Sequence, residues 1–147
     1  MCLFRNGCRF EIDGIAVSVP ENYCICPDVE CCFENALFFV PPDGSFRVSY
    51  EMHSDCMGTK ETLLQVQSQI ETLHKAGTVE EIEVNGLKGH CFTYGGKVDQ
   101  YFEARFSVDK ESGTEFAFTI HTENHDIESI MASPQFNKLL YGIGKAY

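Results

Sequence analysis

The chain has 147 residues, and its 22 acidic and 11 basic side chains give a formal net charge of −11 with the histidines neutral. A chain of this length is typical of one domain and buries enough surface for a core without disulfides or structural metals. The 44% of hydrophobic and 22% of charged residues exclude disorder and low complexity. Because phosphate binding needs clustered lysine and arginine, the acidic balance also argues against a nucleic-acid partner.

Two hairpins are predicted in the first third of the chain. Apolar and polar side chains alternate there with the period of half-buried strands, and glycine and proline mark the turns. The hairpins pair segment 9–13 with 15–19 around Gly14, and segment 37–40 with 46–52 around Pro41-Pro42-Asp43-Gly44. We therefore expect antiparallel pairing within each region.

A single long amphipathic helix is predicted over residues 60–76. Its apolar residues recur at spacings of three, four and three, which gives one stripe for burial against a sheet. The stripe consists of Leu63, Val66, Ile70 and Leu73. Thr59 is placed to cap this helix, and Gly77 is placed to end it.

An antiparallel meander of three strands is predicted after the helix. Its segments are 87–94, 98–108 and 116–121, joined by Gly95-Gly96 and by the polar residues 109–113. In the middle strand the alternation places Phe102, Ala104, Phe106 and Val108 on one face, and Tyr101, Glu103, Arg105 and Ser107 on the other. A shorter strand, 79–84, precedes the meander. Asn85-Gly86 is either a tight turn or a bulge within one long strand, and we favour the bulge.

Two helices are predicted near the C-terminus. A short one covers 126–132, and Ser133-Pro134 begins a second, whose apolar face consists of Phe136, Leu139, Leu140 and Ile143. Runs of strands with separate helices, rather than strict alternation, favour an α+β fold with a single, mainly antiparallel sheet and helices packed on it. Since no repeat or linker divides the chain, one domain over residues 1–147 is expected.

Four segments carry a resemblance to a known family. They are Phe10 to Pro20 (FEIDGIAVSVP), the predicted helix, the segment 82–89 (IEVNGLKG) and the segment 136–143 (FNKLLYGI). In this order they resemble the PsbP-like superfamily, which includes photosystem II PsbP, the Mog-type Ran-binding factor and uncharacterised bacterial relatives. The resemblance implies a PsbP-like α/β/α sandwich and a binding or adaptor role, because the known members act mainly through protein partners. It supplies no catalytic motif, and the cysteine-rich loop departs from its pattern.

Four of the eight cysteines lie in this loop and are candidate metal ligands. They are Cys24, Cys26, Cys31 and Cys32. Structural zinc sites usually present two cysteine pairs separated by a longer span, whereas here the last two cysteines are adjacent. The Cys-x-Cys spacing also differs from the Cys-x-x-Cys of thioredoxin-like redox sites. We favour buried or loop thiols, with a thiol-based metal-binding or redox protein as the alternative.

A nucleophilic cysteine and the histidines are further candidates. Cys56 lies near His53 and the predicted helix start, where a dipole and an imidazole can activate a thiolate. Cys56 precedes the cap, however, and no oxyanion-hole motif accompanies it, so a loop thiol is favoured. His90 and His121 can come close together only if the strand register places them side by side. His125 follows His121 in the sequence, with Glu123 between these two histidines. For these histidines, solvent exposure or contact with a covering helix is favoured.

Together these features predict a non-enzymatic binding or adaptor domain that acts through a protein partner. No phosphate-binding motif is complete, and no cofactor is expected. The sequence has no apolar run of about 18 residues and no secretory signal at its start, so we expect a cytoplasmic protein with reduced thiols and no membrane partner. Tyr94 and Tyr101 flank the Gly95-Gly96 turn, where exposed aromatic side chains favour protein contacts.

Overall fold

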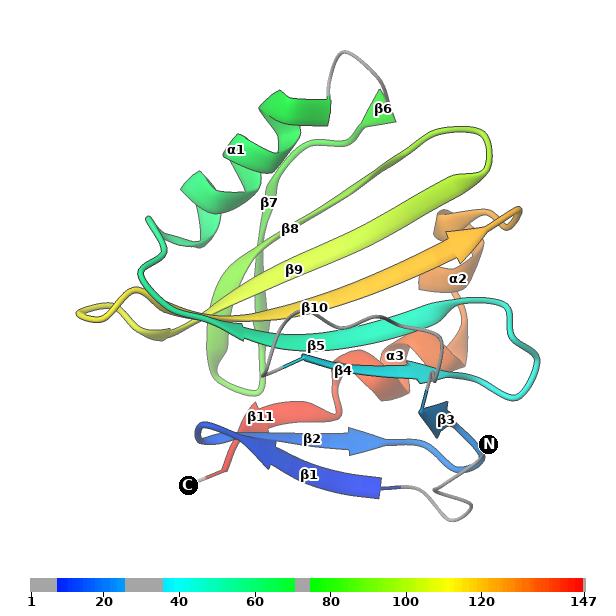
Figure 1. The fold of residues 1–147 in the computed structure, drawn as a ribbon, viewed down its shortest axis with the longest axis horizontal. Helices are drawn as coiled ribbons and strands as arrows, with labels where there is room; N and C mark the ends of the chain where they lie inside the picture. The colour runs from blue at the N-terminus through cyan, green and yellow to red at the C-terminus, as the bar shows by residue number, and fades with distance from the viewer. Residues whose placement is uncertain (1–7, 26–35, 71–74, 147) are drawn as a thin grey trace.

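The computed structural model describes residues 8–25, 36–70 and 75–146 (Figure 1). The described strands are β1 (Cys8–Ile12), β2 (Ile15–Val19), β3 (Cys24–Ile25), β4 (Ala36–Val40), β5 (Arg47–His53), β6 (Lys75–Ala76), β7 (Glu80–Val84), β8 (Leu87–Gly95), β9 (Asp99–Asp109), β10 (Thr114–Glu123) and β11 (Ile143–Lys145). The described helices are α1 (Thr59–Ile70), α2 (Ile127–Met131) and α3 (Pro134–Leu140). The strands form an eight-stranded sheet in the order β3-β4-β5-β10-β9-β8-β6, with β7 also paired to β8, and a three-stranded sheet in the order β1-β2-β11.

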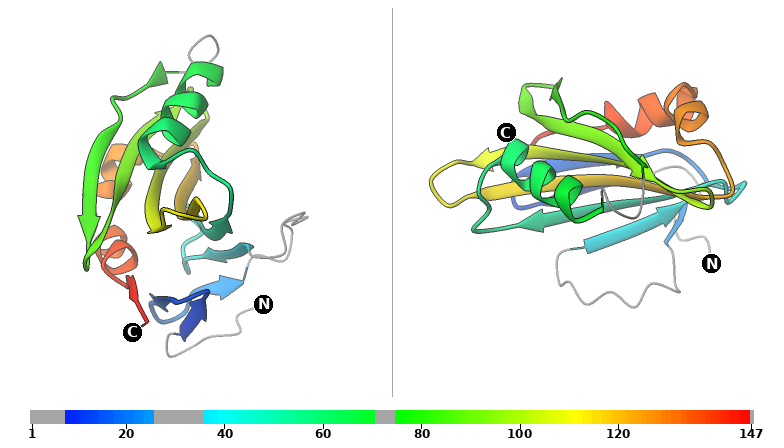
Figure 2. Two further views of the ribbon diagram at one scale, coloured as in Figure 1. Left: turned by 90° about the vertical axis from the view of Figure 1, so that its left-hand side faces the viewer. Right: turned by 90° about the horizontal axis from the view of Figure 1, so that it is seen from above.

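The large sheet lies between α1 on one face and α2, α3 and the small sheet on the other (Figure 2). The core lies on the second face. There Phe102 and Phe118 each contact Phe136 of α3 edge to face, with ring centroids 5.1 and 6.3 Å apart. Phe10 of β1 packs against Tyr50 of β5 on the same side. This layering is the predicted α+β, α/β/α sandwich. Among the described helices, none combines the length and the hydropathy needed to span a membrane.

Both predicted N-terminal hairpins and the meander are confirmed. β1 pairs with β2, β4 with β5, and β8, β9 and β10 pair in sequence, all antiparallel. The alternation also assigns the faces correctly, because Phe102, Ala104 and Phe106 are almost fully buried on the core side. The two C-terminal helices begin where expected, since the side chains of Asp126 and Ser133 cap α2 and α3.

The expectation of a single sheet is wrong. Ile143, predicted to continue the last helix, lies in β11 and pairs with Val17 of β2. The helix ends at Leu140, and the next residues bring the chain against β2, where Ser18 N–H donates to Gly142 O at 2.8 Å. A Cβ at Gly142 would lie 2.6 Å from the Ser18 carbonyl oxygen, so this close approach needs glycine.

The predicted helix over residues 60–76 is also too long. α1 ends at Ile70, and Lys75–Ala76 form the strand β6, paired with Tyr94 and Gly95 of β8. As a strand, Lys75–Ala76 forms backbone hydrogen bonds with β8 at the sheet edge. At the end of a longer helix, the last carbonyl groups would have no partner within the helix. Of the predicted stripe, Leu63 is fully buried and Val66 half-buried, whereas the side chains of Ile70 and Leu73 lie outside the described residues.

Asn85-Gly86 forms a tight turn rather than the bulge that we favoured. Val84 and Leu87 are direct partners, so β7 and β8 form a hairpin with a two-residue loop. Both loop residues have positive φ, 50° and 83°, which is the type I′ geometry suited to Asn-Gly. The Asn85 amide donates to the carbonyl of Ile143 at 2.7 Å and thus fastens this turn to the small sheet.

Candidate functional site

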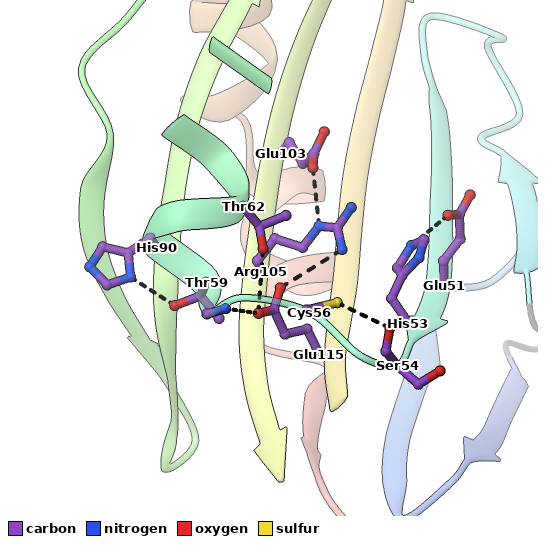
Figure 3. A network of polar contacts seen from close by, with 11 residues as sticks. Glu51, His53, Ser54, Cys56, Thr59, Thr62, His90, Glu103, Arg105 and Glu115 are labelled. Atoms are coloured by element: carbon purple, nitrogen blue, oxygen red, sulfur yellow. Dashed lines mark hydrogen bonds and ion pairs between the residues drawn. The ribbon is translucent and has the colours of Figure 1, made fainter. Parts of the chain in front are cut away.

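A buried network of charged side chains lies on the α1 side of the large sheet (Figure 3). Arg105 of β9 is at its centre. Its Nε lies 3.2 Å from Glu103 Oε2, and its Nη1 lies 3.9 Å from Glu115 Oε1 of β10. Successive side chains of a strand point to opposite faces of the sheet. Because the sequence neighbours Ala104 and Phe116 are buried in the core, these charged side chains point to the α1 side. Two carboxylates therefore share one guanidinium under α1.

The network also holds the start of α1. The Gly58 N–H donates to Glu115 Oε2 at 3.1 Å, and the Thr62 hydroxyl points at the same oxygen. The first N–H groups of a helix have no partner within the helix, and its dipole favours a negative charge at this end. Glu115, at 2% exposure, thus acts as an N-terminal cap supplied by the sheet.

Cys56 and His53, considered above as a candidate nucleophile and its activating base although a loop thiol was favoured, make other contacts. His53 Nε2 lies 2.9 Å from Glu51 Oε2, and the Cys56 thiol points at the Ser54 carbonyl oxygen at 3.7 Å (Figure 3). Burial, and then the charge of Glu115, raises the pKa of Cys56 above its usual value. The thiol is therefore held protonated, which is the opposite of the shift that activates a nucleophile.

His90 and His121 occupy different levels of the sheet and do not meet. Across β9, His90 is opposite Arg105 and His121 is opposite Tyr101, so they are four residues apart along that strand. His90 Nδ1 instead lies 2.8 Å from the Thr59 hydroxyl of α1, the favoured contact with a covering helix.

Aromatic rings form a continuous row across β8, β9 and β10. Phe92 stacks on Tyr94, Tyr94 on Tyr101, and Tyr101 on His121, with centroid distances of 4.9, 4.8 and 4.5 Å. The Tyr94 hydroxyl donates to Glu103 Oε1 at 3.1 Å, and burial followed by this carboxylate raises the pKa of Tyr94. Tyr94 and Tyr101 are half-buried in this row rather than exposed at the turn.

The cysteine loop lies mostly outside the described residues. Cys24 belongs to β3, opposite Val40 of β4. Cys26, Cys31 and Cys32 fall in the segment that is not described, so the favoured loop thiols and the alternative metal site both stay predictions. Elsewhere, burial raises the pKa of Cys8, and it raises that of Cys91 to about 11.

Part of this site follows from the sequence pattern. The alternation along β9 correctly placed Glu103 and Arg105 on one face. The prediction did not include Glu115. The same alternation, extended two residues back from Ala117 along β10, places this carboxylate on the face of Arg105. Which residues pair across strands depends on register, and an irregularity between Thr114 and Glu115 shifts the pairing of β10 with β9 by one residue.

Comparison with known proteins identifies the architecture. The solution structure of cyanobacterial PsbP from Synechocystis sp. PCC 6803 matches 95% of this chain and 92% of its own, with a TM-score of 0.62 and 12% sequence identity. A crystal structure from Bacteroides thetaiotaomicron matches 95% of this chain with a TM-score of 0.54 and 8% identity, and this chain spans 48% of that one. No family model and no curated protein matches the sequence. The chain therefore has the PsbP-like fold that the order of its elements predicted.

Proposed function

We propose that the chain is a non-enzymatic binding domain whose protein partner contacts the α1 side of the large sheet. The observation that carries this proposal is that the described helices cover only part of that face. α1 packs on β8 and β9, and no other described helix extends the cover over β10 and β5 (Figure 2). The part that no described helix covers presents half-buried polar side chains from both strands, among them Glu51, His53 and His121.

Apolar side chains near this face supply anchors for a partner. Met57, just before α1, is 63% exposed, and Leu64 on the helix is 42% exposed. Interfaces commonly combine a few such apolar anchors with a polar surround. Because the chain carries a net charge of −11, we expect the partner to present a basic surface, which speeds encounter at low salt.

The state of the ionisable groups supports binding rather than catalysis. Arg105 is held between Glu103 and Glu115, an arrangement that stabilises the start of α1. Cys8, Cys56 and Cys91 all have a pKa raised by burial, so each is a poor nucleophile at neutral pH. Perturbed groups that serve a structural purpose of this kind are not evidence for an active site.

Site-specific photo-crosslinking tests the proposal. A photoreactive side chain at Met57 or Leu64 should capture one protein in cells. The same side chain at Tyr141, which is 59% exposed beyond α3 on the other side of the sheet, should not. The purified pair should then bind less tightly as salt rises and when Leu64 is changed to Glu. Equal capture from Tyr141, or unchanged binding by Leu64→Glu, would contradict the proposed face.

Thiol labelling tests the opposing idea of a cysteine enzyme. A labelling time course on the folded protein at pH 7.5, resolved by peptide, gives a rate for each of the eight cysteines. We expect Cys56 to react more slowly than a free thiol in the unfolded chain. If Cys56 instead reacted far faster than the other seven, and His53→Ala removed the difference, the non-enzymatic assignment would be wrong.

A further inference from the structure

We propose that Asp99, His121 and Glu123 bind a divalent transition-metal cation. They lie where β9 begins and β10 ends, next to the start of the segment that leads into α2 (Figure 1). This site goes beyond the proposed function and does not rest on it.

The strand register brings the three side chains together. Asp99 and Glu123 are direct partners across β9 and β10, and His121 precedes Glu123 by two residues, so all three share one face. Their ligand atoms all lie within 4.8 Å of one another, and His121 Nε2 is 2.8 Å from Asp99 Oδ1. Metal bonds to nitrogen and oxygen of about 2.0–2.2 Å place neighbouring ligand atoms roughly 3–4 Å apart. One ion can therefore contact all three after small side-chain movements.

The imidazole is held in place before any ion binds. Its ring stacks on Tyr101 with an interplanar angle of 12°, and Tyr101 stacks in turn on Tyr94. A ligand that is fixed by its neighbours loses less conformational freedom on binding. His121 and Glu123 also line a pocket of about 270 Å³. Since one water occupies about 30 Å³, the pocket has room for an ion with part of its hydration shell.

Two carboxylates of the cluster favour a cation, and the guanidinium of Arg47 opposes it. Asp99 and Glu123 supply two carboxylates, and the Tyr101 hydroxyl beside them is neutral at physiological pH. Arg47 of β5 is the backbone partner of His121 and lines the same pocket. Its charge lowers the affinity for a cation but is smaller than that of the two carboxylates together.

The donor set identifies the class of ion. One imidazole nitrogen and two carboxylate oxygens suit first-row transition metals, whereas calcium and magnesium prefer oxygen ligands alone. The cluster contains no thiolate, so it has no preference for the softest ions. This separates it from the cysteine loop, which would select zinc or another thiophilic metal.

Manganese(II) is the probe for the experiment, because it binds nitrogen and oxygen ligands and competes poorly for the eight cysteines. As Mn²⁺ is added to uniformly ¹⁵N-labelled protein, its paramagnetism broadens the amide signals nearest to it. We expect the signals of residues 99–101 and 121–124 to broaden first. A tenfold excess of Mg²⁺ should leave this broadening largely intact.

Matched variants separate ligation from general attraction. Asp99→Asn, Glu123→Gln and His121→Phe should each weaken Mn²⁺ binding at least tenfold, and His121→Phe keeps a ring for the stack on Tyr101. Glu51→Gln is the control, since Glu51 forms the other histidine–carboxylate pair on this face, with a 2.9 Å contact, and should leave the affinity within twofold. Arg47→Gln should tighten binding about threefold by removing the opposing charge.

Three outcomes would overturn the proposal. The first is broadening that begins at the acidic strand β7, with its exposed Glu80, Glu81 and Glu83, which would indicate diffuse attraction. The second is unchanged affinity in His121→Phe. The third is displacement of Mn²⁺ by an equal concentration of Mg²⁺. Should His121→Phe lose its folded spectrum, Glu123→Gln decides the question, because Glu123 is exposed and this substitution is expected to leave the fold intact.

Discussion

The two faces of the large sheet are stabilised in different ways, although they are built from the same strands. On the core face, Phe106 of β9 and Phe118 of β10 are fully buried among other apolar side chains. On the α1 face, the side chains of Arg105 and Glu115 from the same two strands are 13% and 3% exposed, and they depend on each other's charge. A core position tolerates any neighbour of suitable shape, whereas a charged position needs one particular partner.

Truncation on the core face should have the largest effect on stability. Phe118 is fully buried and contacts the rings of Phe102 and Phe136. Phe118→Ala removes most of a buried ring and leaves a cavity, so we expect the free energy of unfolding to fall by about 3–5 kcal/mol in a urea titration. Thr119→Ala, the next residue on the α1 face, is the control and should cost less than about 1 kcal/mol. Similar losses for both variants would contradict the contrast between the faces.

Removal of the central cation should have the next largest effect. Arg105→Met keeps much of the side-chain volume but leaves Glu103 and Glu115 buried without their shared guanidinium. Breaking a buried pair from one side is strongly destabilising, and we expect a loss of about 3 kcal/mol in the same assay. The exposed Lys110→Met is the matched control for loss of a positive charge.

The double variant Arg105→Met/Glu115→Gln then tests the cause. Since it removes one of the two uncompensated carboxylates, it should be more stable than Arg105→Met alone. If the second change instead added a further loss of similar size, the two side chains would be stabilising the fold independently.

The core face could be predicted from the sequence almost completely, and the α1 face only in part. Alternation along one strand places Phe102 and Glu103 on opposite faces without any knowledge of the fold. The pair Arg105–Glu115 depends on strand register, and the cap on Gly58 depends on where α1 lands on the sheet. Asp99 escaped notice as a partner of His121 because the alternation gives only its face, which it shares with Tyr101, whereas its distance from His121 depends on the register of β9 and β10.

Sequence pattern also failed where backbone pairing replaced a helix. The predicted helices extended to Ala76 and to Ile143, yet Lys75–Ala76 and Ile143–Lys145 pair with strands. Periodicity shows only which side chains are apolar. A short segment fits the same pattern whether it continues a helix or pairs as a strand at a sheet edge. The competing hydrogen-bond partners on β8 and β2 are distant in sequence, so no local signal reveals them.

A hydrogen bond on the α1 face should have a smaller effect than the charge network. Tyr94→Phe keeps the ring between Phe92 and Tyr101 but removes the hydroxyl that donates to Glu103 Oε1. Because Glu103 is only 7% exposed, water does not fully replace this donor. We expect a loss of about 1–2 kcal/mol by urea denaturation. Tyr141→Phe, at an exposed hydroxyl, should change stability by no more than a few tenths of a kcal/mol.

The smallest effect expected is a loss of stability in alkali caused by a thiol on the core face. Burial, and then the charge of Glu80, raises the pKa of Cys91 from its usual value of 9.0 to about 11. Below pH 9 the thiol is protonated in both the folded and the unfolded chain, so its contribution to stability is fully present. Between pH 9 and 11 the unfolded chain releases this proton while the folded chain retains it, and the free energy of unfolding falls as pH rises.

Denaturation of Cys91→Ala at pH 8 and pH 10 isolates this contribution. The variant should be somewhat less stable than the natural sequence at pH 8, because it loses a packed side chain, and the gap should narrow at pH 10. Cys56→Ala serves as the comparison on the α1 face, where the pKa of Cys56 is raised by less burial and by the charge of Glu115. If the gap for Cys91→Ala were constant between the two pH values, the thiol would be ionising at the same pH in both states and burial would not be protecting it.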